Sequence, residues 1–166
     1  MNPSLSLAAI ALLLSLSLPM QAQDTPPPMP ASIALEQIEY RNAQYGFCFT
    51  LPASWQGYTI VSDGWDGTPR DGGPAVTGPK LLIRNPAWMA GNPREDIPIL
   101  IFTTAQWRRV VKERMSVSAA PFNPFQLGHN RRYVFAVPAR FDFDQLPGVE
   151  EVSKLVMSKS LRAPCR

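Results

Sequence analysis

Eighteen prolines spread over 166 residues constrain the fold of this chain more than any other feature of its sequence. Average proline usage is about 5%, so this chain carries about twice the usual share. A proline inside a helix costs about 3 kcal/mol, because it removes a backbone hydrogen bond and clashes with the preceding turn. The chain therefore cannot be mostly long helix, and we expect a compact α+β domain with long irregular connections.

The rest of the composition is that of a globular protein. Apolar residues make up 45% of the chain and charged residues 17%, with a formal net charge of +3. A disordered chain would have fewer aromatic residues and a larger net charge. One domain is the natural number at this length.

The N-terminus has the pattern of a secretory signal over residues 1–22. An apolar run from Leu5 to Leu18 is short for a membrane span, and Ala22 offers a small residue at a cleavage site. The segment before the run has no Lys or Arg, so an uncleaved membrane anchor is the alternative. No later stretch is long enough to span a membrane. We therefore expect a secreted or periplasmic protein with no stable membrane span after cleavage.

Residues 23–32 are predicted to form a proline-rich linker, and residues 33–166 a single domain. Export makes Cys48 and Cys165 a candidate disulfide. Phe47 and Phe49 should share one face of a strand, which points Cys48 to the other face, where the C-terminal segment could cover it. Two free thiols are the alternative. A catalytic cysteine is disfavoured, because no Cys-x-x-Cys is present.

Alternating and apolar runs predict the strands, and Gly/Pro-rich stretches predict the loops. Residues 97–102 are almost continuously apolar, which indicates a central strand covered on both faces. Long loops are expected at 62–79 and 85–96. The other expected strands are 46–51, 58–62, 80–84 and a hairpin formed by 125–127 and 133–137.

Two amphipathic helices are expected. Thr103 and Gln106 fit a capping box at the start of the first helix, whose apolar stripe would be Trp107, Val110, Val111 and Met115. Pro147 suits the first turn of the second helix. Glu150 and Glu151 follow it, where the helix dipole favours acidic residues.

The motif Y-x-N-x-x-Y-G-F-x-F-x-L-P-x-x-W over residues 40–55 resembles the opening of PsbP/Mog1-like domains. The resemblance implies an antiparallel sheet flanked by helices, that is, an α-β-α sandwich within the α+β class. Known members are extrinsic photosystem II subunits, binders of a small GTPase and exported bacterial proteins. The resemblance therefore implies binding rather than chemistry. It carries over no functional residue, because no metal-binding or GTPase-binding motif of the family is matched.

Tryptophans and acidic residues in the predicted loops are the candidate binding residues. Trp65 and Trp88 lie in the two Gly/Pro-rich loops, where they could be recognition anchors or could pin the loops to the domain. Trp55 and Trp107 are expected in the core. Asp63 and Asp66 could offer oxygen ligands to Ca²⁺, but their spacing matches no EF-hand loop, and a flexible series of turns is favoured.

An enzymatic alternative rests on Asp142 and Asp144, which would share one face of an extended segment and could serve a hydrolase. A solvated edge or a helix cap is the competing interpretation. His129 is the only histidine and lies in a predicted turn, where exposed histidines are common. No motif for a metal or a cofactor is present, so we expect neither.

Basic residues of the first helix and of the predicted hairpin, among them Arg108, Arg131 and Arg132, could form a patch for an anionic envelope surface. For Arg108, Arg109 and Lys112 a solvated helix face is the simpler interpretation, and export argues against a nucleic-acid partner. Together these observations predict a non-enzymatic exported domain that recognises a protein or envelope component through its long loops. A secreted hydrolase is the alternative.

Overall fold

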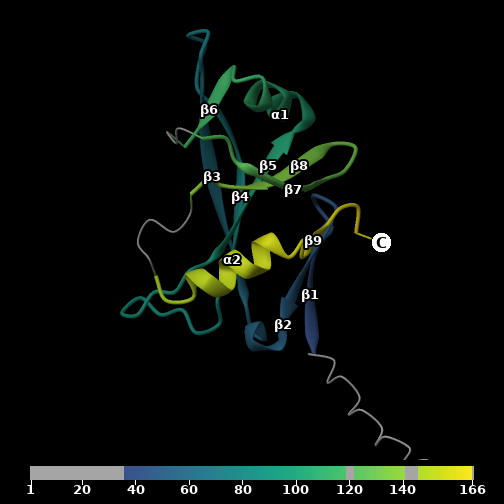
Figure 1. The fold of residues 1–166 in the computed structure, drawn as a ribbon, viewed down its shortest axis with the longest axis vertical. Helices are drawn as coiled ribbons and strands as arrows, with labels where there is room; N and C mark the ends of the chain where they lie inside the picture. The colour runs from purple at the N-terminus through teal and green to yellow at the C-terminus, as the bar shows by residue number, and fades with distance from the viewer. Residues whose placement is uncertain (1–35, 119–121, 141–145, 166) are drawn as a thin grey trace, which may run out of the picture. The chain divides into compact units, whose positions relative to one another are not determined.

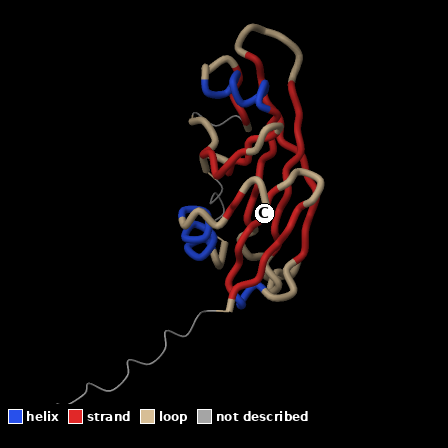
Figure 2. The backbone as a smooth tube through the Cα atoms, turned by 90° about the vertical axis from the view of Figure 1, so that its right-hand side faces the viewer, coloured by secondary structure: helices blue, strands red, loops and turns tan. Residues whose placement is uncertain are grey.

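The computed structural model describes residues 36–118, 122–140 and 146–165. About 46% of the described residues lie in antiparallel strands and about 16% in helices, and the strands curl into a half-barrel (Figures 1 and 2). The predicted α-β-α sandwich is therefore wrong. The two α-helices have only eight and nine residues, which is too short to form two layers over a sheet. Within the described residues, no helix combines the length and the apolar character needed to cross a membrane.

A three-stranded antiparallel sheet contains the aromatic N-proximal segment, with β2 in its centre. Phe47, Phe49 and Leu51 alternate along β2 and are fully buried, as their spacing predicted. The strands, in spatial order, are β1 (Gln37–Asn42), β2 (Phe47–Pro52) and β9 (Leu161–Arg162). A short 3-10 helix, η1 (Ala53–Trp55), follows β2.

A six-stranded sheet forms the larger part of the fold, and every neighbouring pair in it is antiparallel. Its two edges are the short strand β6 and the strand β7. In spatial order the strands are β6 (Met115–Val117), β3 (Thr59–Pro69), β4 (Val76–Arg84), β5 (Ile97–Thr103), β8 (Tyr133–Val137) and β7 (Phe125–His129).

The loop predicted over residues 62–79 is wrong, because most of it lies in the long hairpin of β3 and β4 (Figure 1). Gly64, Gly67 and Gly78 lie within the paired strands, whereas Gly72 and Gly73 lie in the turn between them. Gly78 lies opposite Trp65, and a Cβ atom at position 78 would come within 2.4 Å of the indole ring. A glycine inside a strand thus makes room for a large neighbouring side chain.

Alternate side chains of β5 enter two separate cores, which confirms the prediction of a central strand covered on both faces. The major core contains Ile97, Ile99 and Ile101 together with side chains of β2 and of helix α2 (Val149–Met157). The minor core contains Leu100 and Phe102 together with side chains of β6 and of helix α1 (Thr104–Val111).

The predicted capping box at the start of α1 is present. The Gln106 backbone N–H donates to Thr103 Oγ1 at 3.2 Å, and the Thr103 N–H donates to Gln106 Oε1 at 2.8 Å. The predicted apolar stripe is only partly correct, because Val110 is buried whereas Val111 is 52% exposed. Met115 belongs to β6, since the helix ends at Val111 and the chain turns.

Helix α2 begins two residues after Pro147, with Gly148 as its N-cap at a φ of 98°. This positive φ is open to glycine at little energetic cost, and it lets the chain turn sharply into the helix. Glu150 and Glu151 lie in the first turn, as predicted, and Val152 and Val156 are buried in the major core.

Candidate binding groove at the β7 edge

A groove of about 590 Å³ lies between the edge strand β7, helix α2 and strand β9. Both α2 and β9 belong to the C-terminal part of the ribbon, drawn in yellow in Figure 1. Strand β9 approaches β7 at Gly128, where a Cβ atom would lie 2.9 Å from Leu161 Cδ2. The groove is lined by Phe125, Gln126, Leu127, Val137, Ser153, Val156, Met157, Lys159 and Leu161.

The lining is mostly apolar, and two of its large side chains face solvent. Phe125 is 62% exposed and Met157 is 81% exposed, whereas Val137 and Val156 are buried beside them. Exposed apolar side chains that gather around a concavity are typical of interaction sites. Lys159 is exposed on the groove lining and forms no ion pair within the residues that the structure describes.

The strand beside this groove is paired on one side only. Among the described strands β7 pairs with β8, and its register shifts between Gln126 and Gly128, which marks a bulge or irregularity. An edge strand presents unpaired N–H and C=O groups that can pair with another chain. The groove therefore combines apolar side chains with backbone donors and acceptors.

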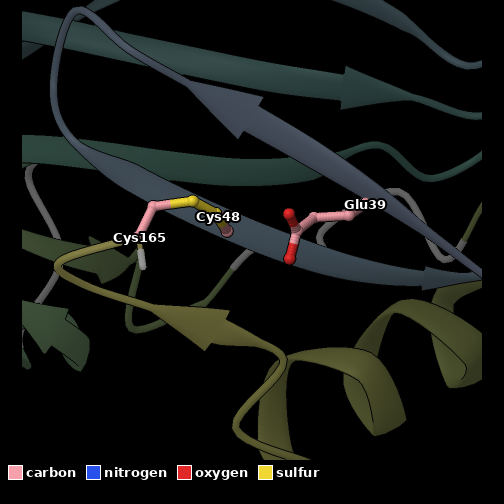
Figure 3. A group of neighbouring side chains, drawn as sticks. All are labelled: Glu39, Cys48 and Cys165. Carbon is pink, nitrogen blue, oxygen red and sulfur yellow. A yellow bond between two sulfur atoms is a disulfide. The ribbon is translucent and has the colours of Figure 1, made fainter.

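A disulfide joins β2 to the segment after β9, as predicted for Cys48 and Cys165 (Figure 3). Cys48 is fully buried. Both sulfur atoms lie within 4.8 Å of a Glu39 carboxylate oxygen, so the three residues are a possible metal-ligand group. However, the sulfur atoms are bonded to each other and offer no thiolates. Disulfides persist in oxidising compartments, so this bond fits an extracellular or periplasmic protein.

Basic side chains near the disulfide also disfavour the binding of a metal cation. The Glu39 carboxylate forms ion pairs with Arg41, at 2.8 Å between Nη2 and Oε1, and with Arg162. Two guanidinium groups already neutralise this carboxylate. The three residues are therefore a disulfide and a neighbouring carboxylate that is ion-paired with two arginines.

The structure places Trp65 in the minor core, where it is only 2% exposed. Its ring lies 4.4 Å from that of Phe102, and its Nε1–H donates to the Ile101 carbonyl oxygen at 2.9 Å. Burial in this position leaves no indole surface for a partner. Trp65 therefore stabilises the fold.

The other predicted binding residues are not gathered with Trp65. Trp88 is partly buried and lies beneath the Arg84 guanidinium, whose central carbon is 4.0 Å from the ring centroid. Position 84 is six residues along β4 from the partner of Trp65, or about 20 Å at strand spacing. Asp66 is exposed on β3, opposite Thr77.

Asp63 is engaged by a neighbouring strand. Lys80 Nζ lies 2.6 Å from its Oδ2, and the Gly64 backbone N–H donates to its Oδ1 at 2.7 Å. These two hydrogen bonds, that from Lys80 first, lower the pKa of the Asp63 carboxyl. The carboxylate is a partner of a lysine within the sheet.

The other residues singled out from the sequence lie in different parts of the chain. Trp55 is fully buried, and its Nε1–H donates to Glu151 Oε1 at 3.0 Å, which links η1 to α2. Trp107 is partly buried at the side of the minor core. His129 is exposed at the end of β7, with Nδ1 3.3 Å from Gln126 Nε2. Asp142 and Asp144 lie outside the described residues, as do the predicted signal and linker.

Sequence reasoning missed the groove, although it predicted the hairpin that supplies one wall. Met157 follows Val152 and Val156 but lies off their buried face, which a helical projection of residues 149–157 could have indicated. No local signal indicates that β9 approaches β7, with which it does not pair. Neither a scan against protein-family models nor searches of curated proteins and solved structures found a match to this chain. The resemblance to PsbP/Mog1-like domains therefore stays a prediction.

Proposed function

We propose that this protein is an exported, non-enzymatic binding domain whose groove at β7 takes up an extended apolar segment of a partner protein. One observation carries the proposal. A groove of about 590 Å³ runs beside an edge strand with one described partner, and Phe125 and Met157 flank it in solvent. In this proposal the recognition surface lies at β7, away from the predicted Gly/Pro/Trp loops.

An extended segment fits this site because strand addition would use both the unpaired backbone of β7 and the apolar groove beside it. Backbone groups of the incoming segment pair with the free edge of β7, and alternate side chains enter the apolar groove. The five residues of β7 span about 17 Å at strand spacing, so the segment needs about five or six residues. Lys159 favours a carboxylate at one end of it.

Export is the second part of the proposal. The Cys48–Cys165 bond supports an oxidising compartment, and residues 1–22 have the pattern of a signal. Mass determination of the protein recovered from its native compartment tests this part. We expect a chain that begins at Gln23, and a chain that retains residues 1–22 would contradict cleavage.

The hydrolase alternative has less support among the described residues. Burial raises the pKa of the Asp96 carboxyl, a property of many catalytic acids. However, Arg84 Nε donates to Asp96 Oδ2 at 3.1 Å, and Asp96 does not line the groove. The carboxylate is part of an ion pair between β4 and the segment before β5.

Selection from a random peptide library displayed on phage tests the binding proposal. We expect enrichment of segments in which apolar and polar residues alternate. The substitution Met157→Glu places a charge on the groove and should weaken the recovered peptides about tenfold or more. Met89→Glu is the matched control, because Met89 is 60% exposed and lies in the connection between β4 and β5.

The control should change the affinity by less than about twofold, within the usual effect of a remote surface substitution. Failure to enrich any alternating peptide would overturn the proposal. An equal loss of affinity in the Met157→Glu and Met89→Glu variants would also overturn it, because it would indicate nonspecific apolar attraction.

A further inference from the structure

A second cavity, of about 860 Å³, lies where two hairpin turns meet the C-terminal segment. We call it the turn pocket. One wall is the turn between β1 and β2, and a second is the end of β7 with the turn that follows it. The third is Ala163 and Pro164. The lining residues are Ala43, Gln44, Tyr45, Gly46, His129, Asn130, Arg131, Arg132, Tyr133, Ala163 and Pro164.

Asn130 holds the first two walls together. Its Nδ2 donates to the carbonyl oxygens of Tyr45 and Gly46, at 2.8 and 3.3 Å. Its Oδ1 accepts from the backbone N–H groups of Arg132 and Tyr133, both at 2.9 Å. One amide side chain thus satisfies groups in two turns that are far apart in the sequence, which fixes the spacing of the walls.

The disulfide holds the third wall. Pro164 precedes Cys165, and Cys48 lies two residues after Gly46. The bond therefore holds the C-terminal segment next to the first turn. On the inner side the rings of Tyr45 and Tyr133 meet edge to face at 5.4 Å between centroids. The pocket is therefore preformed, which lowers the entropy that a ligand must lose on binding.

The charge of the lining has one sign. Arg131 and Arg132 contribute it, and no Asp or Glu lines the pocket. Elsewhere in the fold Arg41, Arg84, Arg109 and Arg162 each pair with a carboxylate. Within the described part of the chain no carboxylate pairs with Arg131 or Arg132. The guanidinium groups of two consecutive, exposed residues are thus left for an external anion.

We propose that the turn pocket binds the phosphate group of a phosphorylated ligand. Guanidinium groups offer paired N–H donors that match phosphate oxygens, and such charge-assisted bonds are about twice as strong as neutral ones. The Tyr rings and Pro164 contact the apolar part that adjoins the phosphate. The same chemistry is found in free phosphorylated small molecules and in anionic phospholipid headgroups. The site is separate from the β7 groove, and it does not depend on the function proposed for that groove.

Calorimetric titration with inorganic pyrophosphate and co-sedimentation with vesicles test this site on the full mature chain. One vesicle preparation contains phosphatidylglycerol and phosphatidylcholine, and the other contains phosphatidylcholine alone. The double variant R131Q/R132Q removes both guanidinium groups. The matched control R108Q/K112Q removes two charges from exposed positions in α1 and at its C-cap.

We expect the R131Q/R132Q variant to bind about tenfold more weakly and the control less than about twofold more weakly. Saturable binding of pyrophosphate assigns the site to small phosphorylated molecules, whereas binding only to phosphatidylglycerol vesicles assigns it to headgroups. The proposal is overturned if the wild-type chain binds neither probe. It is also overturned if both variants lose binding equally, because net charge alone would then explain the attraction.

Discussion

The two edges of the six-stranded sheet are built differently. The β6 edge has three residues, and its Met115 and Val117 are 1% and 3% exposed in the minor core. The β7 edge has five residues and an irregular register, and Phe125 at its start is 62% exposed. Short edges anchored in a core have little free backbone for pairing, whereas longer exposed edges attract other chains.

This difference supports the binding role proposed for the β7 edge. Sheet proteins commonly protect their edges, and β6 is protected by its length and by its buried side chains. An edge that keeps a large aromatic side chain in solvent beside an apolar groove has the features of an interaction site. In this account the β6 edge completes the fold and the β7 edge binds.

Removing the disulfide should lower the free energy of unfolding more than any other change. The β7 side of the fold should also lose stability. Cys48 and Cys165 are separated by 117 residues, and the chain-entropy relation gives about 5 kcal/mol for a loop of that size. Urea unfolding of Cys48→Ser/Cys165→Ser measures the loss. Equal stability of the variant and the oxidised wild type would show that the bond does not hold β9 against β2.

The substitution Trp65→Ala should cost about 4 kcal/mol, because it leaves a cavity in the minor core and removes the hydrogen bond to Ile101. Trp88→Ala is the matched control. This variant loses the cation–π contact between Arg84 and Trp88, which is worth about 0.5–1 kcal/mol. Thermal unfolding measures both variants. A loss at Trp88 as large as that at Trp65 would contradict the burial described for the β6 side.

Adding one methyl group near each edge should show whether the side chain that it meets is rigid or can move. A Cβ at Gly78 would meet the Trp65 ring at 2.4 Å, so Gly78→Ala should cost about 3 kcal/mol. A Cβ at Gly128 would meet the tip of Leu161 at 2.9 Å, which can move, so Gly128→Ala should cost about 1 kcal/mol. Denaturant midpoints measure both changes. The reverse order would indicate that the β7 edge is the more tightly packed one.

Several parts of this structure could be predicted from local patterns. The apolar run at 97–102, the face alternation around Cys48, the hairpin of β7 and β8, and the capping box at Thr103 all follow from spacing and side-chain chemistry. The disulfide was predictable because Cys48 had to point away from the buried phenylalanines. In each case the sequence signal lies within a few residues along the chain, even for the disulfide, whose two cysteines are 117 residues apart.

Other parts depended on contacts between distant residues. Glycine and proline between 62 and 79 predicted a loop, but Gly78 is needed because Trp65 fills the space above it. The predicted helical layers failed because both α-helices end after a few turns, and the strands β1, β6 and β9 were missed. The groove could not be predicted, since its walls come from residues 125–127, 153–157 and 159–161 and meet only in the fold.

The ion pair between β3 and β4 should have the smallest effect and should leave both edges unchanged. Hydrogen bonds from Lys80 and Gly64 lower the pKa of Asp63, so its contribution is present above the unfolded value of 3.8. It is lost as the pH falls through the lowered folded-state value. Asp63→Asn should therefore cost less than about 1 kcal/mol at neutral pH, since Asp63 is half exposed, and the cost should fall as the pH drops below 3.8. A loss that is constant with pH would contradict this explanation.

Hydrogen exchange of the backbone amides, with and without a groove-binding peptide selected as described above, tests the central claim most directly. The account predicts slower exchange in β7, between Phe125 and His129, and no change in β6, between Met115 and Val117. Protection confined to other elements, or unchanged exchange in β7 at saturating peptide, would contradict the assignment of β7 as the binding edge.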